Sequence, residues 1–217
     1  LIVSQKRCAA AGVYTKNLVK GAPIIVTQEH IKNGYARAII VNSGNANTCN
    51  DNGIEIAEGM CELVEKYTGI CSCDVVVGST GVIGQKLSLE PITCGMPALL
   101  MGLGKNSDDA ATAIMTTDTV KKEVAIKFEL GGKTVKMGAI AKGSGMIHPD
   151  MATMLVFVTT DAAISPEMLQ KALEFSIADS FNMIRVDRDT STNDTMVVLA
   201  NAMAENEEIA SEGKDFE

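Results

Sequence analysis

The pattern of apolar and polar positions predicts strands and helices that alternate along the chain. An apolar, β-branched run at 36–41 is followed at 42–47 by Asn, Ser and Gly residues, which predicts a strand and then a loop. Apolar residues then recur at helical spacing over 53–67, and Gly69 lies just beyond them, so this segment is predicted to be a helix.

A second buried strand is predicted at 74–78, and it runs into the glycine-rich loop 79–84. The glycines leave backbone amides of this loop free to face a ligand, so the loop is a candidate site. Two prolines within 87–101 argue against one uninterrupted helix there, whereas the acidic start of 108–115 suits a helix N-terminus.

The second half of the chain continues the alternation. Segments 124–130 and 135–141 flank two glycines and predict a hairpin, and 154–158 is another buried strand. Ser165 and Pro166 form a capping pair for a helix that extends to about Ile177.

The remaining segments are less regular. Residues 183–186 are predicted to be extended and 187–194 to form a loop, while 195–204 fits helix and strand periods equally well and 205–217 is predicted to be an exposed acidic tail. The whole pattern indicates a layered α/β or α+β fold with sheet buried by helices, and it excludes a purely helical bundle.

Composition narrows the possible functions. The chain has 217 residues, enough for one large domain or two small ones, and its net charge of −8 without a basic run argues against nucleic acid as a partner. No apolar run approaches the length of a membrane span. His30 and His148 are the only histidines, so a multi-histidine metal site is excluded and no metal is expected. The six cysteines lack zinc-ribbon spacing and predict reduced, mostly buried thiols in a cytoplasmic protein.

Several segments resemble known binding or catalytic motifs but do not match them fully. Gly143 and Gly145 lack the third glycine of a dinucleotide-binding fingerprint, and the glycines of 78–84 lack the Lys-Ser/Thr pair of a P-loop. Asp187 and Asp189 are paired acids, but in a loop rich in Ser, Thr and Asn such acids more often cap the backbone than catalyse.

The segment 142–161 is different in kind. Glycines and a proline lead to Ala152 and then to Thr153, which opens an apolar strand. This places one hydroxyl at a loop-to-strand junction, where backbone strain can be held and self-cleavage is expected. Without further information, the residues favour the simpler interpretation that Thr153 is a β-branched residue that starts a strand.

Five motifs, in the same order along the chain, resemble the ornithine acetyltransferase family, also called glutamate N-acetyltransferase. They are CAAGVYT at 8–15 in a closely similar form, NSGNAN at 42–47, GSTGVIG at 78–84, PDMATML at 149–155 and DTSTND at 189–194. The resemblance spans essentially all 217 residues, but chains of that family are longer, so we expect this sequence to be a catalytic-domain fragment of a longer protein. Asp150, Asn50-Asp51 and Arg188 depart from the family pattern.

The resemblance implies a self-cleaving fold of the N-terminal-nucleophile kind, with paired sheets layered between helices. Cleavage between Ala152 and Thr153 would give chains 1–152 and 153–217. The new chain would begin with an α-amine beside a hydroxyl, so one residue would supply both nucleophile and general base.

The resemblance also assigns the remaining site residues. The Thr80 hydroxyl and the Gly81 backbone N–H would stabilise the oxyanion, whereas on its own the Thr80 hydroxyl would bond within its turn. Lys142 and Thr116 would bind substrate, with Thr117 the less favoured hydroxyl; without the resemblance, Lys142 is an ordinary surface lysine.

By this resemblance the reaction is acetyl transfer from N-acetylornithine to glutamate in arginine biosynthesis, without a cofactor. Some members of the family also use acetyl-CoA as co-substrate, and no residue here decides between the two. The cleaved chains are expected to associate into a heterotetramer. Two alternatives stay open: a self-cleaving amidohydrolase or aminopeptidase, and a metabolite-binding module that keeps Thr153 uncleaved.

Overall fold

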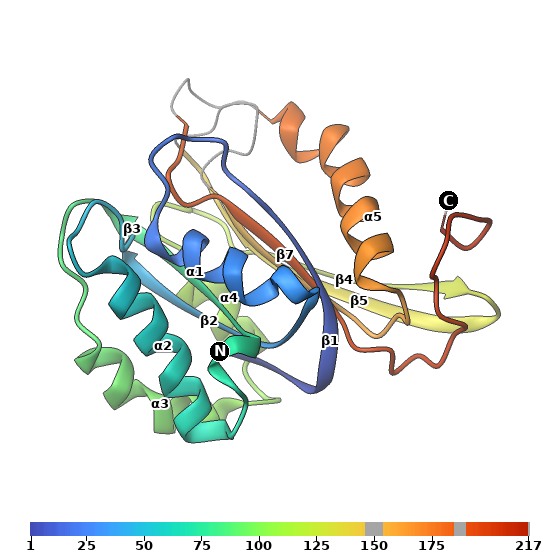
Figure 1. The fold of residues 1–217 in the computed structure, drawn as a ribbon, viewed down its shortest axis with the longest axis horizontal. Helices are drawn as coiled ribbons and strands as arrows, with labels where there is room; N and C mark the ends of the chain where they lie inside the picture. Colours follow the sequence, from blue (N-terminus) through green and yellow to red (C-terminus); the bar gives the residue numbers. More distant parts are fainter. Residues whose placement is uncertain (146–153, 185–189, 217) are drawn as a thin grey trace.

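The computed structural model describes residues 1–145, 154–184 and 190–216, and all structural statements below refer to these. They form one seven-stranded sheet in the order β3-β2-β1-β7-β6-β5-β4 (Figure 1). The strands are β1 (Ile2–Tyr14), β2 (Tyr35–Asn45), β3 (Val75–Val82), β4 (Lys122–Leu130), β5 (Lys133–Lys142), β6 (Leu155–Thr160) and β7 (Thr195–Ala200). The expected layered α/β fold is confirmed, with a single sheet in these residues.

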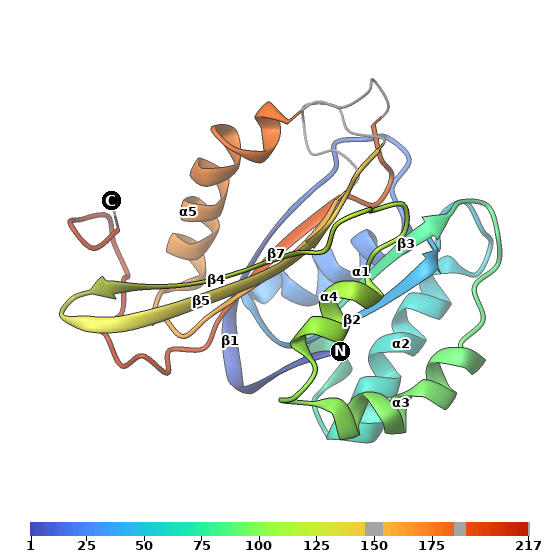
Figure 2. The same ribbon diagram turned by 180° about the vertical axis from the view of Figure 1, so that it is seen from behind.

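Five α-helices accompany the sheet in the described ranges. They are α1 (Ala22–His30), α2 (Gly53–Thr68), α3 (Glu90–Gly102), α4 (Ser107–Ala113) and α5 (Pro166–Ala178), with 3-10 turns at Ile31–Asn33, Ser72–Asp74 and Phe181–Met183. Figure 1 shows α1, α2 and α3 grouped near β2 and β3, and α5 on its own beside β1 and β7; the reverse view in Figure 2 shows α4 in front of the sheet. None of these helices is both long enough and apolar enough to cross a membrane.

Two of the strand pairs are parallel, β2 with β3 and β6 with β7, and the other four are antiparallel. Strands that run parallel begin at the same edge of a sheet. The starts of β6 and β7 therefore lie side by side, and so do the ends of β2 and β3. These two meeting points build the candidate site.

Alternate residues of β6 pack into two different clusters of the hydrophobic core. Val156 and Val158 pack with Leu169 and Leu173 of α5, whereas Leu155 and Phe157 pack with Leu199, Ile39 and Val76 in a separate cluster. Successive strand residues point to opposite faces, so both faces of β6 are buried. The Ser165 hydroxyl accepts a hydrogen bond from the Met168 amide and begins α5 as the sequence predicts.

Three expectations are wrong. A single helix, α3, spans Glu90–Gly102, because Pro91 occupies the first turn, where its missing N–H costs nothing, and the helix continues through Pro97. Met183 ends a 3-10 turn and is not extended. All six cysteines are free thiols, but only Cys8 and Cys61 are buried.

Candidate active site

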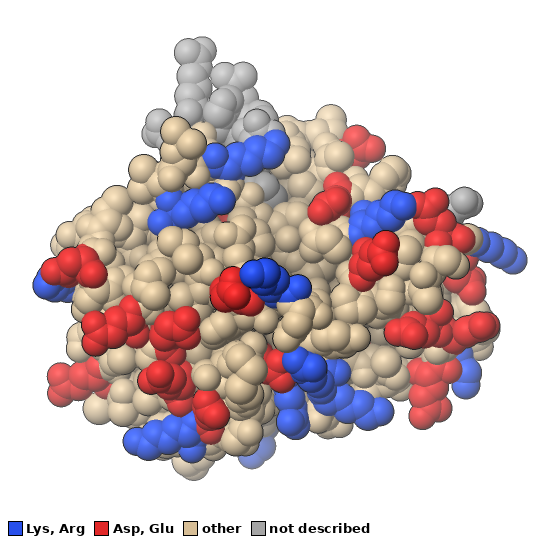
Figure 3. Space-filling model, viewed as in Figure 1, with Lys and Arg blue, Asp and Glu red and all other residues tan. Residues whose placement is uncertain are grey.

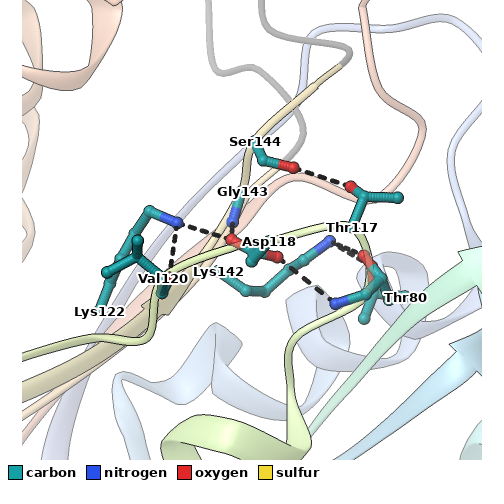
Figure 4. A network of polar contacts seen from close by, with 9 residues as sticks. Thr80, Thr117, Asp118, Val120, Lys122, Lys142, Gly143 and Ser144 are labelled. Atoms are coloured by element: carbon teal, nitrogen blue, oxygen red, sulfur yellow. Dashed lines mark hydrogen bonds and ion pairs between the residues drawn. The ribbon is translucent and has the colours of Figure 1, made fainter.

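Lys142 is the centre of a buried polar cluster. It is the last residue of β5 and is only 3% exposed, so the surface-lysine interpretation is wrong. Its Nζ donates hydrogen bonds to Thr80 Oγ1 at 2.9 Å and to Thr116 Oγ1 at 2.8 Å, as the close view in Figure 4 shows for Thr80. Three residues singled out from the sequence thus come together from β3, β5 and the loop that follows α4.

The hydrogen-bond donors of the Lys142 ammonium fix the direction of the hydrogen bonds in this cluster. An ammonium carries three donors and no acceptor, so both threonine hydroxyls accept from Lys142. The hydroxyl hydrogen of Thr80 is therefore left to donate to another group. Among the residues that the structure describes, the third hydrogen of the Lys142 ammonium has no acceptor, so it is available to an anionic ligand.

Asp118 is a buried carboxylate that connects the segments around Lys142. Its Oδ1 accepts hydrogen bonds from the Gly143 amide at 2.7 Å and from Lys122 Nζ at 2.7 Å, and its side chain is fully buried. Burial raises the pKa of the Asp118 carboxyl, but hydrogen bonds from Lys122, Gly143 and Thr116 outweigh burial and hold it below its usual value. Asp118 thereby ties the residue after Lys142 to the loop that carries Thr116 (Figure 4).

Burial also lowers the pKa of the Lys142 ammonium, and the carboxylates of Asp118 and Asp194 partly oppose this shift. Elsewhere on the molecule, basic and acidic side chains are interspersed on the face shown in Figure 3. Lys142 differs from those surface cations because it is buried with carboxylates nearby.

Gly81 brings β3 into close contact with β2. Its φ is +132°, and a Cβ at this position would lie 2.2 Å from the carbonyl carbon of Gly44 in β2. Only glycine tolerates both this positive φ and the lack of space for a Cβ. The backbone around Gly81 is thus set directly beside the Asn42–Asn47 segment, with Thr80 as its immediate neighbour.

A cavity of about 310 Å³ opens beside these groups. The residues that line it come from six separate segments: Ala46, Thr80, Gly81, Ile83, Thr116, Thr117, Lys142, Gly145, Met154, Leu155, Ser191, Thr192, Asn193 and Asp194. Thr117 lines it too, but its hydroxyl pairs with Ser144 Oγ at 2.8 Å and not with Lys142. Of these two threonines, Thr116 is therefore the one whose hydroxyl contacts Lys142.

Asn193 holds the walls of the cavity together. Its Nδ2 donates to the carbonyls of Ala46 at 2.6 Å and Ser79 at 3.0 Å, and its Oδ1 accepts from the hydroxyls of Thr48 and Thr192. Every hydrogen-bonding direction of a buried side-chain amide is used in this arrangement. The loops after β2 and before β7 are fixed to β3 by this one residue.

Asp194 directly precedes β7 and lies beside Met154, the residue before β6. Its Oδ1 accepts a hydrogen bond from the Met154 amide at 2.8 Å, and the residue is fully buried. Burial raises the pKa of its carboxyl from 3.8 to about 7, although the Met154 amide, Ser191 and Lys142 act in the opposite direction.

The site residues inferred from the sequence fall into two groups. Thr80, Gly81, Thr116 and Lys142 line the same cavity. Ala152 and Thr153 lie outside the described residues, as do Asp150 and 185–189, which include Arg188 and the acids Asp187 and Asp189. Met154, the next residue after Thr153, lines that cavity.

Three residues of the site were missed by the sequence analysis. Asp118 follows two threonines already noticed, and Asn193 and Asp194 end the DTSTND motif. The motif marked the correct loop, but nothing in its composition shows which of its side chains are buried.

Comparison with known proteins decides the family. The model of the ArgJ family matches residues 1–217. The chain belongs to the ArgJ family. Arginine biosynthesis bifunctional protein ArgJ 1 of Clostridium acetobutylicum is 49% identical over 219 residues, covering 100% of this chain and 54% of that protein. The ArgJ protein of Symbiobacterium thermophilum is 50% identical over 211 residues, 96% of this chain and 52% of its own length. The chain therefore spans about half the length of the curated ArgJ relatives it matches.

Two solved ArgJ-type structures are also similar. A crystal structure of the arginine biosynthesis bifunctional protein ArgJ from Bacillus halodurans has 42% identity and a TM-score of 0.63, covering 69% of this chain and 80% of that one. The ornithine acetyltransferase of Mycobacterium tuberculosis, solved with ornithine, has 31% identity and a TM-score of 0.55, covering 67% and 78%. Both similarities agree with the mixed α/β fold described above.

Proposed function

We propose that the protein containing this chain transfers the acetyl group of N-acetylornithine to glutamate through an acetyl-threonine intermediate on Thr153. The observation that carries this proposal is the convergence of Lys142, Thr80 and Thr116 beside Met154, the residue that follows Thr153. The relative from M. tuberculosis is named ornithine acetyltransferase and was solved with ornithine, which supports the substrate class.

Self-cleavage between Ala152 and Thr153 is the first step of the proposal. The Thr153 hydroxyl attacks the Ala152 carbonyl, the peptide shifts to an ester, and water hydrolyses the ester. This leaves Ala152 as a new C-terminus and Thr153 with a free α-amine. An amine with a pKa of about 8 then serves as the base for its own hydroxyl, so no histidine is needed.

Acetyl transfer follows in two half-reactions. Thr153 Oγ attacks the acetyl carbonyl as its proton passes to the α-amine, and the tetrahedral intermediate expels the ornithine amine, which takes that proton. The glutamate amine then attacks the acetyl-threonine ester and restores the hydroxyl. Each intermediate carries an oxyanion, and the Thr80 hydroxyl has a hydrogen to donate to it because its oxygen already accepts from Lys142. The Gly81 amide is the second proposed donor.

Lys142 has a proposed role in binding as well. Two of its three ammonium hydrogens bond to Thr80 and Thr116, and the third, which no described residue accepts, would bond to a substrate carboxylate. No described residue decides whether acetyl-CoA also serves as donor. We propose that the protein acts in the cytoplasm without a cofactor, as a heterotetramer of cleaved chains.

The test uses the full-length protein. Denaturing electrophoresis with N-terminal sequencing should show a second chain that begins Thr-Met-Leu, and Thr153→Ala should abolish both the second chain and acetyl transfer. Incubation with labelled N-acetylornithine alone should place one acetyl group on Thr153, which indicates ping-pong kinetics. A fully active protein with one intact chain would refute the mechanism, and release of free acetate without transfer to glutamate would point to a hydrolase.

A further inference from the structure

The carboxylate of Asp118 bonds to both of the segments that carry the proposed substrate-binding residues. Its Oδ1 accepts at 2.7 Å from the amide of Gly143, the residue after Lys142 (Figure 4), and its Oδ2 accepts at 3.4 Å from the Thr116 amide. Lys142 ends β5 and Thr116 lies in the loop after α4, 26 positions away. One carboxylate therefore fixes the backbone beside the ammonium and beside the hydroxyl that this ammonium contacts.

Asp118 also brings a negative charge into the interior. Its side chain is fully buried, whereas the side chain of its ion-pair partner Lys122 is 45% exposed. Although burial opposes it, the hydrogen bonds from Lys122, Gly143 and Thr116 keep the pKa of the Asp118 carboxyl below its usual value, so the group is ionised at neutral pH. A charge in such surroundings is poorly screened and acts strongly on its neighbours.

The charge of Lys142 depends on groups from several elements. Burial lowers the pKa of its ammonium, the carboxylates of Asp118 and Asp194 raise it, and the Lys122 ammonium lowers it. The neighbours that adjoin Lys142 from β3, from the loop after α4 and from β6 are uncharged: Thr80, Thr116 and Leu155. Asp118 and Lys122 thus have opposite effects on Lys142, although they form an ion pair with each other.

We propose that Asp118 is a positioning residue for substrate binding: it fixes the backbone beside Lys142 and Thr116, and its buried negative charge keeps the Lys142 ammonium protonated to receive the substrate carboxylate. The inference rests on the proposed function, because it assumes that Lys142 binds this carboxylate. Asp118 acts through its neighbours, since it is not among the described residues that line the cavity.

Two variants separate the charge of Asp118 from its ion pair. Asp118→Asn removes the negative charge and keeps a carbonyl oxygen to accept from the Gly143 amide. Lys122→Met removes the partner cation at a half-exposed position and leaves the carboxylate in place. Both variants break the same ion pair, so a purely structural role predicts the same direction of change in both. An electrostatic role predicts opposite directions.

Asp161→Asn and Lys86→Met are the matched controls. Asp161 Oδ1 accepts from the Lys136 amide at 2.7 Å just beyond the end of β6, and Lys86 pairs with Asp51 on the surface. These variants make the same chemical changes away from the cavity. Their kcat and KM should stay within about twofold of wild type.

The experiment measures the kcat and the KM for glutamate of the full-length protein between pH 6 and pH 10. In parallel, the acetylation of Lys142 by acetic anhydride is followed over the same range from peptide masses. Only the uncharged amine reacts with the anhydride, so this labelling reports the charge of Lys142 independently of acetyl transfer.

Asp118→Asn should raise the KM for glutamate at pH 8 by about tenfold, the lower end of the loss expected for one hydrogen bond to a charged group, while kcat changes less. In this variant the rise of KM with pH and the onset of Lys142 labelling should both move to lower pH, because the ammonium loses a stabilising carboxylate. In Lys122→Met both should move to higher pH, because a repelling cation is gone.

The outcomes distinguish this inference from the function beneath it. A wild-type protein that transfers no acetyl groups would overturn the proposed function and the inference with it. In an active wild type, the inference alone would be overturned if the two variants moved both profiles in the same direction or left them unchanged. Should Asp118→Asn fail to fold, Lys122→Met decides: Lys142 labelling that moves to higher pH supports the inference, and an unchanged profile overturns it.

Discussion

The Lys142 ammonium lies 2.9 Å from the hydroxyl oxygen of Thr80, although the two residues are 62 positions apart in the chain. Since an ammonium cannot accept, the Thr80 hydroxyl must turn its hydrogen away from Lys142. A hydroxyl that accepts from a cation is also the better donor, because its O–H bond is further polarised. One contact therefore orients and strengthens the proposed oxyanion donor.

Thr80→Val should slow acetyl transfer by about 10²- to 10³-fold, because it removes one oxyanion donor and keeps the shape of the side chain. Steady-state kinetics of the cleaved, full-length enzyme measure this loss. Thr117→Val is the matched control: it removes a hydroxyl from the same cavity that bonds to Ser144 and not to Lys142, so its kcat should stay within about threefold of wild type. Equal losses in both variants would contradict a special role for Thr80.

Lys142→Met should raise the KM for glutamate and lower kcat/KM by about 10- to 150-fold, which corresponds to one lost hydrogen bond to a charged group. Methionine retains the length and the apolar stem of the side chain. Lys86→Met is the control, since Lys86 pairs with Asp51 on the surface. If the KM for glutamate were unchanged in Lys142→Met, the third ammonium hydrogen would not bind the substrate carboxylate.

Gly81→Ala should destabilise the protein by at least about 2 kcal/mol, because the new Cβ meets the Gly44 backbone and φ is +132°. Gly84→Ala provides the comparison: its φ is also positive, at +79°, but a Cβ there would have nothing within 4 Å. Urea unfolding of both variants isolates the cost of the close contact. A Gly81→Ala protein as stable as Gly84→Ala would show that β2 and β3 can move apart at this point.

The Asp194 carboxyl should make stability depend on pH. Its pKa rises from 3.8 in the unfolded chain to about 7 in the folded protein, so the unfolded state ionises first and stability falls as pH rises from about 4 to about 7. Asp194→Asn cannot ionise. The stability of this variant relative to wild type should therefore increase by up to about 4 kcal/mol between pH 4 and pH 8.

Urea unfolding at both pH values measures this difference, in a Thr153→Ala background that keeps the chain in one piece. Asp161→Asn in the same background controls for the loss of a carboxylate that accepts a backbone N–H. A constant difference between Asp194→Asn and its parent across this range would mean that Asp194 stays ionised in the folded protein.

Local sequence signals predicted much of this fold. The helix at Gly53–Thr68 and the hairpin of Lys122–Leu130 with Lys133–Lys142 follow from apolar periodicity and from two adjacent glycines. Residues 195–204 fit the helix and strand periods equally well, and local sequence signals could not decide between the two. Residues Thr195–Ala200 form a strand because they pair with β1 on one side and β6 on the other, which is a property of the assembled sheet.

The sequence predicted site residues only where they belong to a motif that resembles the family pattern. Thr80, Gly81, Thr116 and Lys142 follow from their resemblance to a family pattern, and the structure places them around one cavity. The contact between Asp194 and Met154 depends on the register of two parallel strands, and no local pattern encodes that register. The burial of Lys142 depends in the same way on β5 lying within the sheet.

The order of the strands has a consequence for what a break in the chain would do. β6 and β7 lie between β1 on one side and β5 on the other, so a cut between β5 and β6 yields a second polypeptide whose strands are threaded through the middle of the first. The backbone hydrogen bonds between β7 and β1 and between β6 and β5 would all have to break before the two polypeptides could separate. Processing at Ala152 would thus create a new terminus without dividing the molecule, and the two polypeptides should elute together in native buffer and separate only in denaturant.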